Sequence, residues 1–173
     1  MLYRPKFDDL YLAHSRAFHL EVEDSYGVAS ENEQLQRFLK GEETGYPDDW
    51  QQWDAFVHEV TDAGTSIQRL RVVTEPHTDY TRFLLRHTDR NVTAGEQVRY
   101  LPRHKVSADA YTVDDWWLFD DSVLAFSVFT PEGEWAGGAI TEDPVIVSRC
   151  VTIRDELWPI GIPFEKYLRD QSR

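Results

Sequence analysis

Asp115-Trp-Trp-Leu-Phe-Asp-Asp121 is followed at once by Ser122-Val-Leu-Ala-Phe-Ser-Val-Phe129, and these two stretches decide the fold of the chain. Each is a short apolar run, and no more than two residues separate them. Apolar runs joined in this way pair as an antiparallel hairpin. We therefore predict a β-hairpin in the C-terminal half of the chain.

The sequence around the hairpin predicts a sheet flanked by helices. Downstream come a turn at Pro131-Glu-Gly133, a Gly-rich strand over 134–141, and a helix over 143–158 with Pro144 in its first turn. Residue spacing elsewhere predicts strands near 17–23, 67–73 and 97–101, and helices near 5–16, 30–40, 48–63, 79–85 and 164–170. The resulting fold class is α/β, a single domain over residues 1–173 with a mixed sheet and C-terminal hairpin strands.

Several details of these elements are testable predictions. We expect Ser30 to cap the second helix and Asp48 or Asp49 to cap the third. In the first strand, alternation places His19 and Glu21 on a face turned to water. The adjacent residues Trp116 and Trp117 would point to opposite sides of their strand, so only one is expected in the core. The other would pack against a helix or contact a ligand or partner.

Composition limits the classes of partner. The 173 residues include 31 acidic and 18 basic side chains, a formal net charge of −13. Direct nucleic-acid binding is therefore not expected, because neutralising phosphates drives that affinity. The charge indicates either a self-repelling surface or an acidic face for a basic partner such as a DNA-binding protein. With no long apolar run and no signal-peptide core near the N-terminus, we expect a cytoplasmic protein without membrane contact. The single cysteine, Cys150, is expected to be a buried, inert thiol.

The candidate chemical groups each have a structural alternative. Glu75 precedes two tripeptides, His77-Thr-Asp79 and His87-Thr-Asp89, which lie ten residues apart. His77 and Asp79 could form an acid/base or metal pair at a strand end, or Asp79 could cap a helix while His77 is solvated. The ten-residue spacing disfavours a shared metal site.

Two further groups also allow two interpretations. Asp120 and Asp121 could act as metal ligands or a general base, or could simply form the hairpin turn. On the strands, Arg69, Arg71, Arg99 and Arg103 would share a face that binds an anion if the two strands are neighbours, or would pair with carboxylates. We find no nucleophile elbow, phosphate-binding loop, dinucleotide glycine motif or paired-cysteine motif, and therefore predict no cofactor and no metal.

The chain resembles a family of small actinobacterial proteins of unknown function, often encoded beside Xre-type helix-turn-helix regulators. The resemblance covers 7–170 and rests on Phe7-Asp-Asp-Leu10, Ala17-Phe-His-Leu-Glu21, Arg71-Val-Val-Thr-Glu-Pro76 with Asp79-Tyr80, Asn91-Val-Thr-Ala-Gly-Glu96 with Arg99, and Trp117-Leu-Phe-Asp-Asp121. It implies a regulator of this type as a possible partner.

A more remote likeness is to one half of a phospholipase D-type domain, whose order of strands, helices and hairpin is similar. It rests on 94–101, 116–129 and 140–158 of this chain. That family requires a His-x-Lys-x4-Asp motif at the hairpin, where this chain has Asp114-Asp-Trp-Trp117. Only Asp121 could correspond to the motif's carboxylate. Without the nucleophilic histidine and the phosphate-binding lysine, that chemistry has no basis here, and no catalytic residue is predicted.

The leading hypothesis is therefore a non-catalytic accessory protein that contacts a helix-turn-helix regulator through acidic and aromatic surface. A rival is a small-anion sensor or hydrolase-type enzyme with a site at the strand ends. A third hypothesis is an acidic DNA mimic. The candidate ligand-binding residues are Glu75, His77, Asp79, Tyr80, Arg99, Trp117 and Asp121. In the sensor or enzyme, Glu75, Tyr80, Arg99 and Asp121 should converge on one cavity.

Overall fold

The predicted hairpin is confirmed in the computed structural model of the chain, which describes residues 7–26, 29–130 and 135–171. Strands β4 (Trp116–Phe119) and β5 (Val123–Phe129) pair antiparallel with Trp117 opposite Ala125. Asp120 and Asp121 have φ angles of 44° and 60°. Two consecutive left-handed residues are what a tight two-residue hairpin turn requires. The turn interpretation of these two aspartates therefore fits the backbone.

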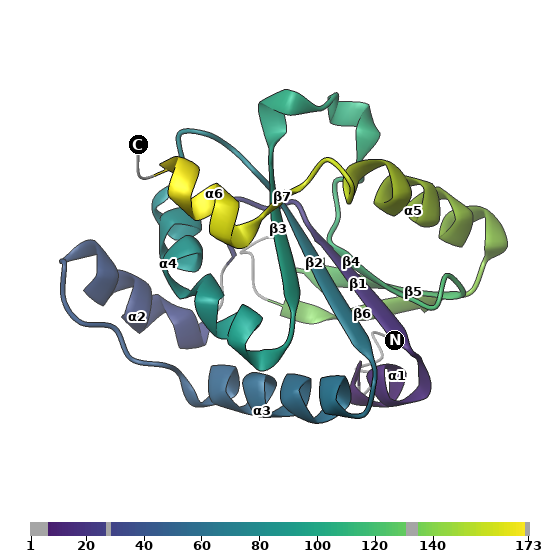
Figure 1. Cartoon of the computed structure of the whole chain (residues 1–173), viewed down its shortest axis with the longest axis horizontal. Helices are drawn as coiled ribbons and strands as arrows, with labels where there is room; N and C mark the ends of the chain where they lie inside the picture. Colours follow the sequence, from purple (N-terminus) through teal and green to yellow (C-terminus); the bar gives the residue numbers. More distant parts are fainter. Residues whose placement is uncertain (1–6, 27–28, 131–134, 172–173) are drawn as a thin grey trace.

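The hairpin belongs to a mixed sheet of seven strands among the described residues, in the order β6-β5-β4-β1-β2-β3-β7 (Figure 1). Strands β1 (Arg16–Glu21), β2 (Ser66–Val73) and β3 (Gln97–Pro102) are parallel and form its centre. Strand β4 joins β1 antiparallel, β6 (Trp135–Thr141) lies at the far edge, and the short β7 (Ile162–Pro163) pairs antiparallel with β3. The predicted turn at 131–133 lies outside the described residues.

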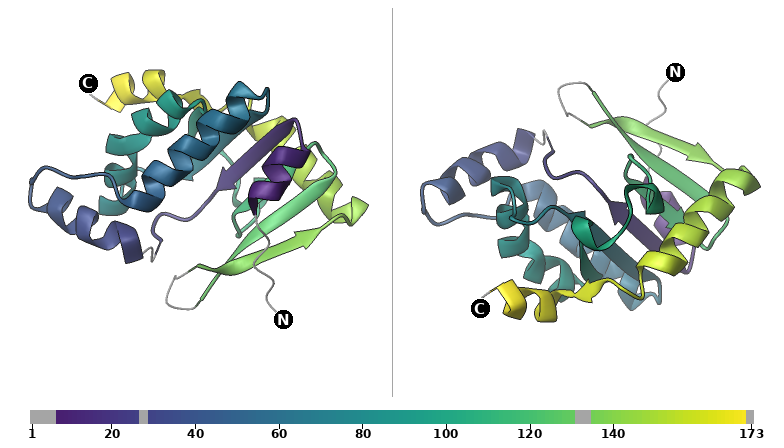
Figure 2. Two further views of the ribbon diagram at one scale, coloured as in Figure 1. Left: turned by 90° about the horizontal axis from the view of Figure 1, so that it is seen from below. Right: turned by 90° about the horizontal axis from the view of Figure 1, so that it is seen from above.

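Helices cover both faces of this sheet (Figure 2). On one face, α5 (Pro144–Leu157) packs on apolar side chains of the strands, including Phe18, Leu70 and Trp116. The other face carries α1 (Phe7–Ala13), α3 (Asp48–Asp62) and α4 (Asp79–Ala94). Helix α2 (Ala29–Leu39) packs against α4, and α6 (Phe164–Gln171) packs beside β3. Two short 3-10 turns, Arg103–Lys105 and Ala108–Ala110, connect β3 to β4.

Because both faces are covered, two predictions about exposure are wrong. Trp116 and Trp117 do point to opposite sides, but both are buried, with 0% and 7% of their surface exposed. The predicted packing of the second tryptophan against a helix is confirmed, because Trp117 lies beside Trp53 of α3. His19 and Glu21 of β1, expected on a face turned to water, are buried as well. The alternation of β1 therefore separates an apolar face under α5 from a polar face that is also enclosed.

Helix boundaries follow local capping with three differences from the sequence prediction. Helix α3 begins at Asp48 after Pro47, and no side chain bonds the first backbone N–H groups from the cap position. Asp48 and Asp49 lie in the first turn, where the helix dipole favours acidic groups, and are not caps. Helix α4 extends well beyond Leu85 and ends at Gly95, whose φ of 116° gives a left-handed end. Thr78, rather than Asp79, caps its start by accepting from the Thr81 N–H.

The side chain of Ser30 lies outside the described residues, so its capping role stays a prediction. At α5 the cap is clear, since Asp143 accepts from the N–H groups of Val145 and Ile146. Cys150 on this helix is buried and free, as predicted. Within the described ranges, no helix combines the length and the apolar character needed to cross a membrane.

Candidate functional site

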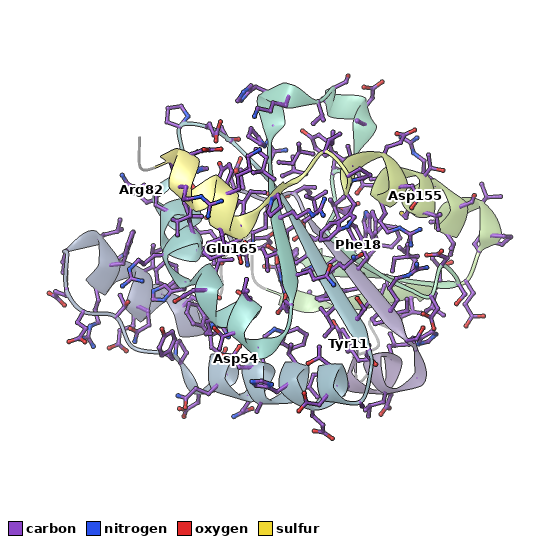
Figure 3. All side chains as sticks on the ribbon, viewed as in Figure 1. Tyr11, Phe18, Asp54, Arg82, Asp155 and Glu165 are labelled. Carbon is purple, nitrogen blue, oxygen red and sulfur yellow. The ribbon has the colours of Figure 1, made fainter. Side chains whose placement is uncertain are left out.

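A cavity of about 410 Å³ lies on the α3 and α4 face of the sheet, toward the carboxyl ends of β1 and β2. Strand residues form its floor, and side chains from α1 to α4 and from the end of β5 form its walls. Figure 3 labels Tyr11, which belongs to the cavity lining, and Asp54 on α3. The carboxyl end of parallel strands is where open α/β sheets commonly place their ligands.

The floor is formed by buried charges on β1 and β2, and their hydrogen-bond network extends to Glu96 between α4 and β3. Parallel pairing sets His19 beside Arg69 and Glu21 beside Arg71. The Arg69 guanidinium donates two hydrogen bonds to Glu96, Nε to Oε2 at 2.6 Å and Nη2 to Oε1 at 3.1 Å. Glu21 accepts from Arg69 and from Arg71. Bidentate and shared contacts of this kind are the strong form of an ion pair.

The pKa directions agree with this pairing. Burial alone would raise the pKa of the Glu21 carboxyl, but Arg71 and Arg69 outweigh it and hold that pKa well below its usual range. Burial likewise opposes ionisation of Glu96, and Arg69 again lowers its pKa. The floor therefore holds two cations and two anions that neutralise one another.

His19 completes the floor as a neutral ring. Burial and the adjacent Arg69 charge lower its pKa well below the ordinary value. Arg69 Nη1 lies 2.9 Å from His19 Nδ1, and a guanidinium can only donate, so Nδ1 accepts and the ring proton lies on Nε2. Nε2 is buried and has no hydrogen-bond partner among the described residues. The cavity is thus lined by a side chain with an unused donor.

Aromatic rings form most of the cavity wall. The Trp117 ring stacks on the His19 ring with centroids 4.0 Å apart and planes within 11°. Further rings of the lining are contributed by several elements and loops, namely Tyr11, Tyr26, Trp50, Trp53, Tyr80 and Phe129. A mostly apolar, aromatic wall with a few fixed polar groups is the usual composition of a small-molecule site.

Two carboxyl groups at the wall differ from those of the floor. Asp115 accepts from the Val22 N–H at 2.7 Å and from the Tyr26 hydroxyl. Glu31 on α2 accepts from the Tyr80 hydroxyl at 2.5 Å and from Trp50 Nε1 at 3.0 Å. All these donors are neutral.

Without an ion pair, burial dominates the ionisation of both groups. Burial and then the nearby Glu21 charge raise the pKa of Asp115 to about 7. Burial also raises the pKa of Glu31, against the hydrogen bonds from Tyr80 and Trp50. The wall therefore carries two carboxyl groups that are costly to ionise.

The predicted site residues occupy different places. Tyr80 and Trp117 line the cavity. Glu75 and His77 meet elsewhere, around the Tyr167 hydroxyl, at 2.6 Å from Glu75 Oε1 and 2.9 Å from His77 Nε2. Asp79 is exposed at the start of α4 and pairs with Arg82.

Arg99 and Asp121 lie apart from both groups. Arg99 donates to the Trp158 carbonyl at 2.6 Å, at the end of α5. Asp121 pairs with Arg16 and Arg154 at the hairpin turn. The convergence of Glu75, Tyr80, Arg99 and Asp121 on one cavity is therefore not observed.

The arginine prediction is correct in part. Strands β2 and β3 are neighbours, but Arg99 is in register with Leu70, so it points to the face opposite Arg69 and Arg71. Arg103 follows β3 and donates to the Val22 and Val72 carbonyls. Of the two interpretations, pairing with carboxylates describes Arg69 and Arg71.

Sequence reasoning missed most of the cavity. The polar lining residues outside the predicted set include His19, Glu21, Glu31 and Asp115, and Glu96 binds the lining residue Arg69 without lining the cavity itself. One signal was available, because the alternating pairs His19/Glu21 and Arg69/Arg71 have the complementary polarity expected of adjacent buried strands. In the described part of the chain, no cluster of three or more His, Cys, Asp or Glu side chains is arranged to hold a metal ion.

Comparison with known proteins assigns a family and no activity. No curated protein matches the chain. A family model described as a domain of unknown function, DUF6879, matches residues 5–169, nearly the whole sequence. The chain therefore belongs to the DUF6879 family, a domain of unknown function.

Proposed function

We propose that this domain is a non-catalytic binding module that holds a small organic molecule in the cavity between the sheet and helices α2 to α4. The observation that carries the proposal is the cavity itself, about 410 Å³ with aromatic walls over a charged floor. Each floor charge is already fixed by another protein group, Arg69 by Glu96 and Arg71 by Glu21. Groups locked in this way orient a ligand well but are poorly suited to act as nucleophiles or bases.

The burial of these charges also supports a binding role. Replacing a buried ion-pair network with apolar residues is often neutral or stabilising, so stability alone is a weak explanation for such a network. Here His19, Glu21, Arg69 and Arg71 of the network also line a cavity. A ligand-orienting role accounts for both features, the fixed charges and the space above them.

The test is a thermal-shift screen of a small-molecule library, repeated with a variant that fills the cavity. Ser127 on β5 lines the cavity, so Ser127→Trp should occlude it. Ser148→Trp, at an exposed position of α5, is the matched control. We expect stabilising compounds with the wild type and with Ser148→Trp, and loss of the effect with Ser127→Trp. A screen without any stabilising compound, or hits that persist in Ser127→Trp, would contradict the proposal.

A role as accessory of a helix-turn-helix regulator is compatible with ligand binding. The family resemblance and the excess of 31 acidic over 18 basic side chains support this role. We also propose that the domain shares ancestry with a phospholipase D-like half domain, and the order of strands, helices and hairpin supports that proposal. A pull-down with the purified neighbouring regulator at micromolar concentration tests the partner role, and no recovery would count against it. A DNA mimic would instead require two rows of carboxylates at phosphate-like spacing.

A further inference from the structure

The charge balance of the cavity points to the class of ligand. Three arginines line it, and each has its own carboxylate: Arg69 pairs with Glu96, Arg71 with Glu21, and Arg90 with Asp54. Glu31 and Asp115 also line the cavity, yet neither forms an ion pair with a described residue. Because the opposite charges within these three ion pairs cancel, the lining retains two carboxyl groups and no unpaired arginine.

These two carboxyl groups are linked by aromatic rings. Tyr26 donates to Asp115 and Tyr80 donates to Glu31, and the two phenol rings are in edge contact with centroids 5.7 Å apart. The Phe129 ring also lies beside Tyr26, with ring centroids 5.4 Å apart. A cation near such rings is stabilised by their electron-rich faces as well as by a nearby carboxylate. An anion would meet two carboxyl groups and arginines whose charges are already neutralised.

We propose that the ligand is a small organic cation, a protonated amine on an aromatic or apolar body, held between Asp115 and Glu31 beside the rings of Tyr26 and Tyr80. This assignment rests on the proposed function, because it specifies the ligand of the same cavity. The amine N–H groups donate to the two carboxylates, which are then ionised. The body lies against the aromatic wall that includes Trp53 and Trp117.

The raised pKa values of Glu31 and Asp115 are consistent with this assignment. In the free protein their ionisation is opposed by burial and by the Glu21 charge. A bound cation supplies the missing countercharge, so binding should lower both pKa values, and Asp115 should release a proton near neutral pH. The unused His19 Nε2–H additionally favours a ligand with a hydrogen-bond acceptor on its body.

The experiment is calorimetric titration of the full chain at pH 8 with ligands that share a body and differ in charge. The probes are tryptamine, tyramine and phenethylamine. Each is compared with the analogue in which a carboxylate replaces the amine and with the analogue in which a neutral alcohol replaces it. We expect at least one amine to bind about tenfold or more tightly than both counterparts, the effect of a charge-assisted hydrogen bond to a largely buried carboxylate. Asp115→Asn and Glu31→Gln should each remove that preference.

Matched controls lie beside both residues. Asp114 and Glu33 are exposed neighbours, so Asp114→Asn and Glu33→Gln should leave amine affinity unchanged. Tighter binding of the carboxylates or alcohols would overturn the cation assignment while the proposed function stands. If no amine binds but other compounds from the library screen do, the cation assignment is also overturned while the proposed function stands. Failure of the amines and of the whole library would overturn both proposals.

Discussion

Asp115→Asn should remove a pH dependence that this buried carboxyl imposes on the stability of the protein. Asp115 is 3% exposed, and the groups that face it are Glu21 of β1, Glu23, the Val22 N–H and Tyr26. Burial and Glu21 raise its pKa from 3.8 to about 7. The folded protein therefore binds more protons than the unfolded chain between these values. The contribution of Asp115 to stability is complete below pH 3.8 and is lost as the pH rises through about 7.

The size of the effect follows from the two pKa values. At about 1.4 kcal/mol per pKa unit, the wild type should lose roughly 2.5 kcal/mol of Asp115-dependent stability between pH 5 and pH 8. Asparagine cannot ionise, so Asp115→Asn lacks this loss. The free energy of unfolding of Asp115→Asn, relative to the wild type, should rise by that amount over the interval. For a chain of this size, the Tm of the variant minus that of the wild type should increase by about 5–10 °C between pH 5 and pH 8.

The assay is urea unfolding followed by tryptophan fluorescence at pH 5, 6, 7 and 8 for both proteins. Asp114→Asn is the control, because Asp114 is exposed. Its free energy of unfolding should stay within about 0.5 kcal/mol of the wild type at every pH. A stability difference between Asp115→Asn and the wild type that is constant from pH 5 to pH 8 would show that Asp115 does not have a raised pKa in the folded protein.

Two further predictions concern the fold that supports the site. Arg69→Met leaves the buried carboxylates of Glu96 and Glu21 without one of their partners, so it should lower the free energy of unfolding by about 3–5 kcal/mol. The control Arg82→Met breaks an exposed pair with Asp79 and should lower it by less than about 1 kcal/mol. Equal losses in chemical unfolding would contradict the stabilising role of Arg69 in the buried network. Gly95→Ala should destabilise more than Gly41→Ala, since both have positive φ but only at Gly95 would a Cβ lie 2.7 Å from Thr61 Oγ1. Calorimetric Tm values would show this order, and equal Tm losses would argue against the steric contact.

The hairpin and most elements could be predicted from the sequence because local chemistry specifies them. Asp120 and Asp121 tolerate the left-handed turn, Asp143 and Pro144 start α5, and the apolar runs on either side of the turn have strand character. The extent of α4 was harder, because its second half is polar in sequence although Thr88 and Asn91 are buried.

The cavity could not be predicted, because it depends on strand register and on which helices cover which face. Alternation correctly put His19 and Glu21 on one side of β1, but only the positions of α3 and α4 turn that side into an enclosed floor. Likewise, Arg99 has the same odd-numbered spacing as Arg69, and the pairing of β2 with β3 places it on the opposite face. A shift of register by one residue exchanges the faces, and spacing within one strand cannot specify register between two.

The proposed binding site for a small molecule is the cavity above Arg69 and Arg71. Its most direct test is a crystal structure of the full chain with the compound that gives the largest thermal shift. We predict that the compound lies between the sheet and α2 to α4, in contact with Trp117 and within hydrogen-bond distance of Asp115 or Glu31. A compound ordered on the α5 face, or a cavity that stays empty beside a ligand bound elsewhere, would contradict it.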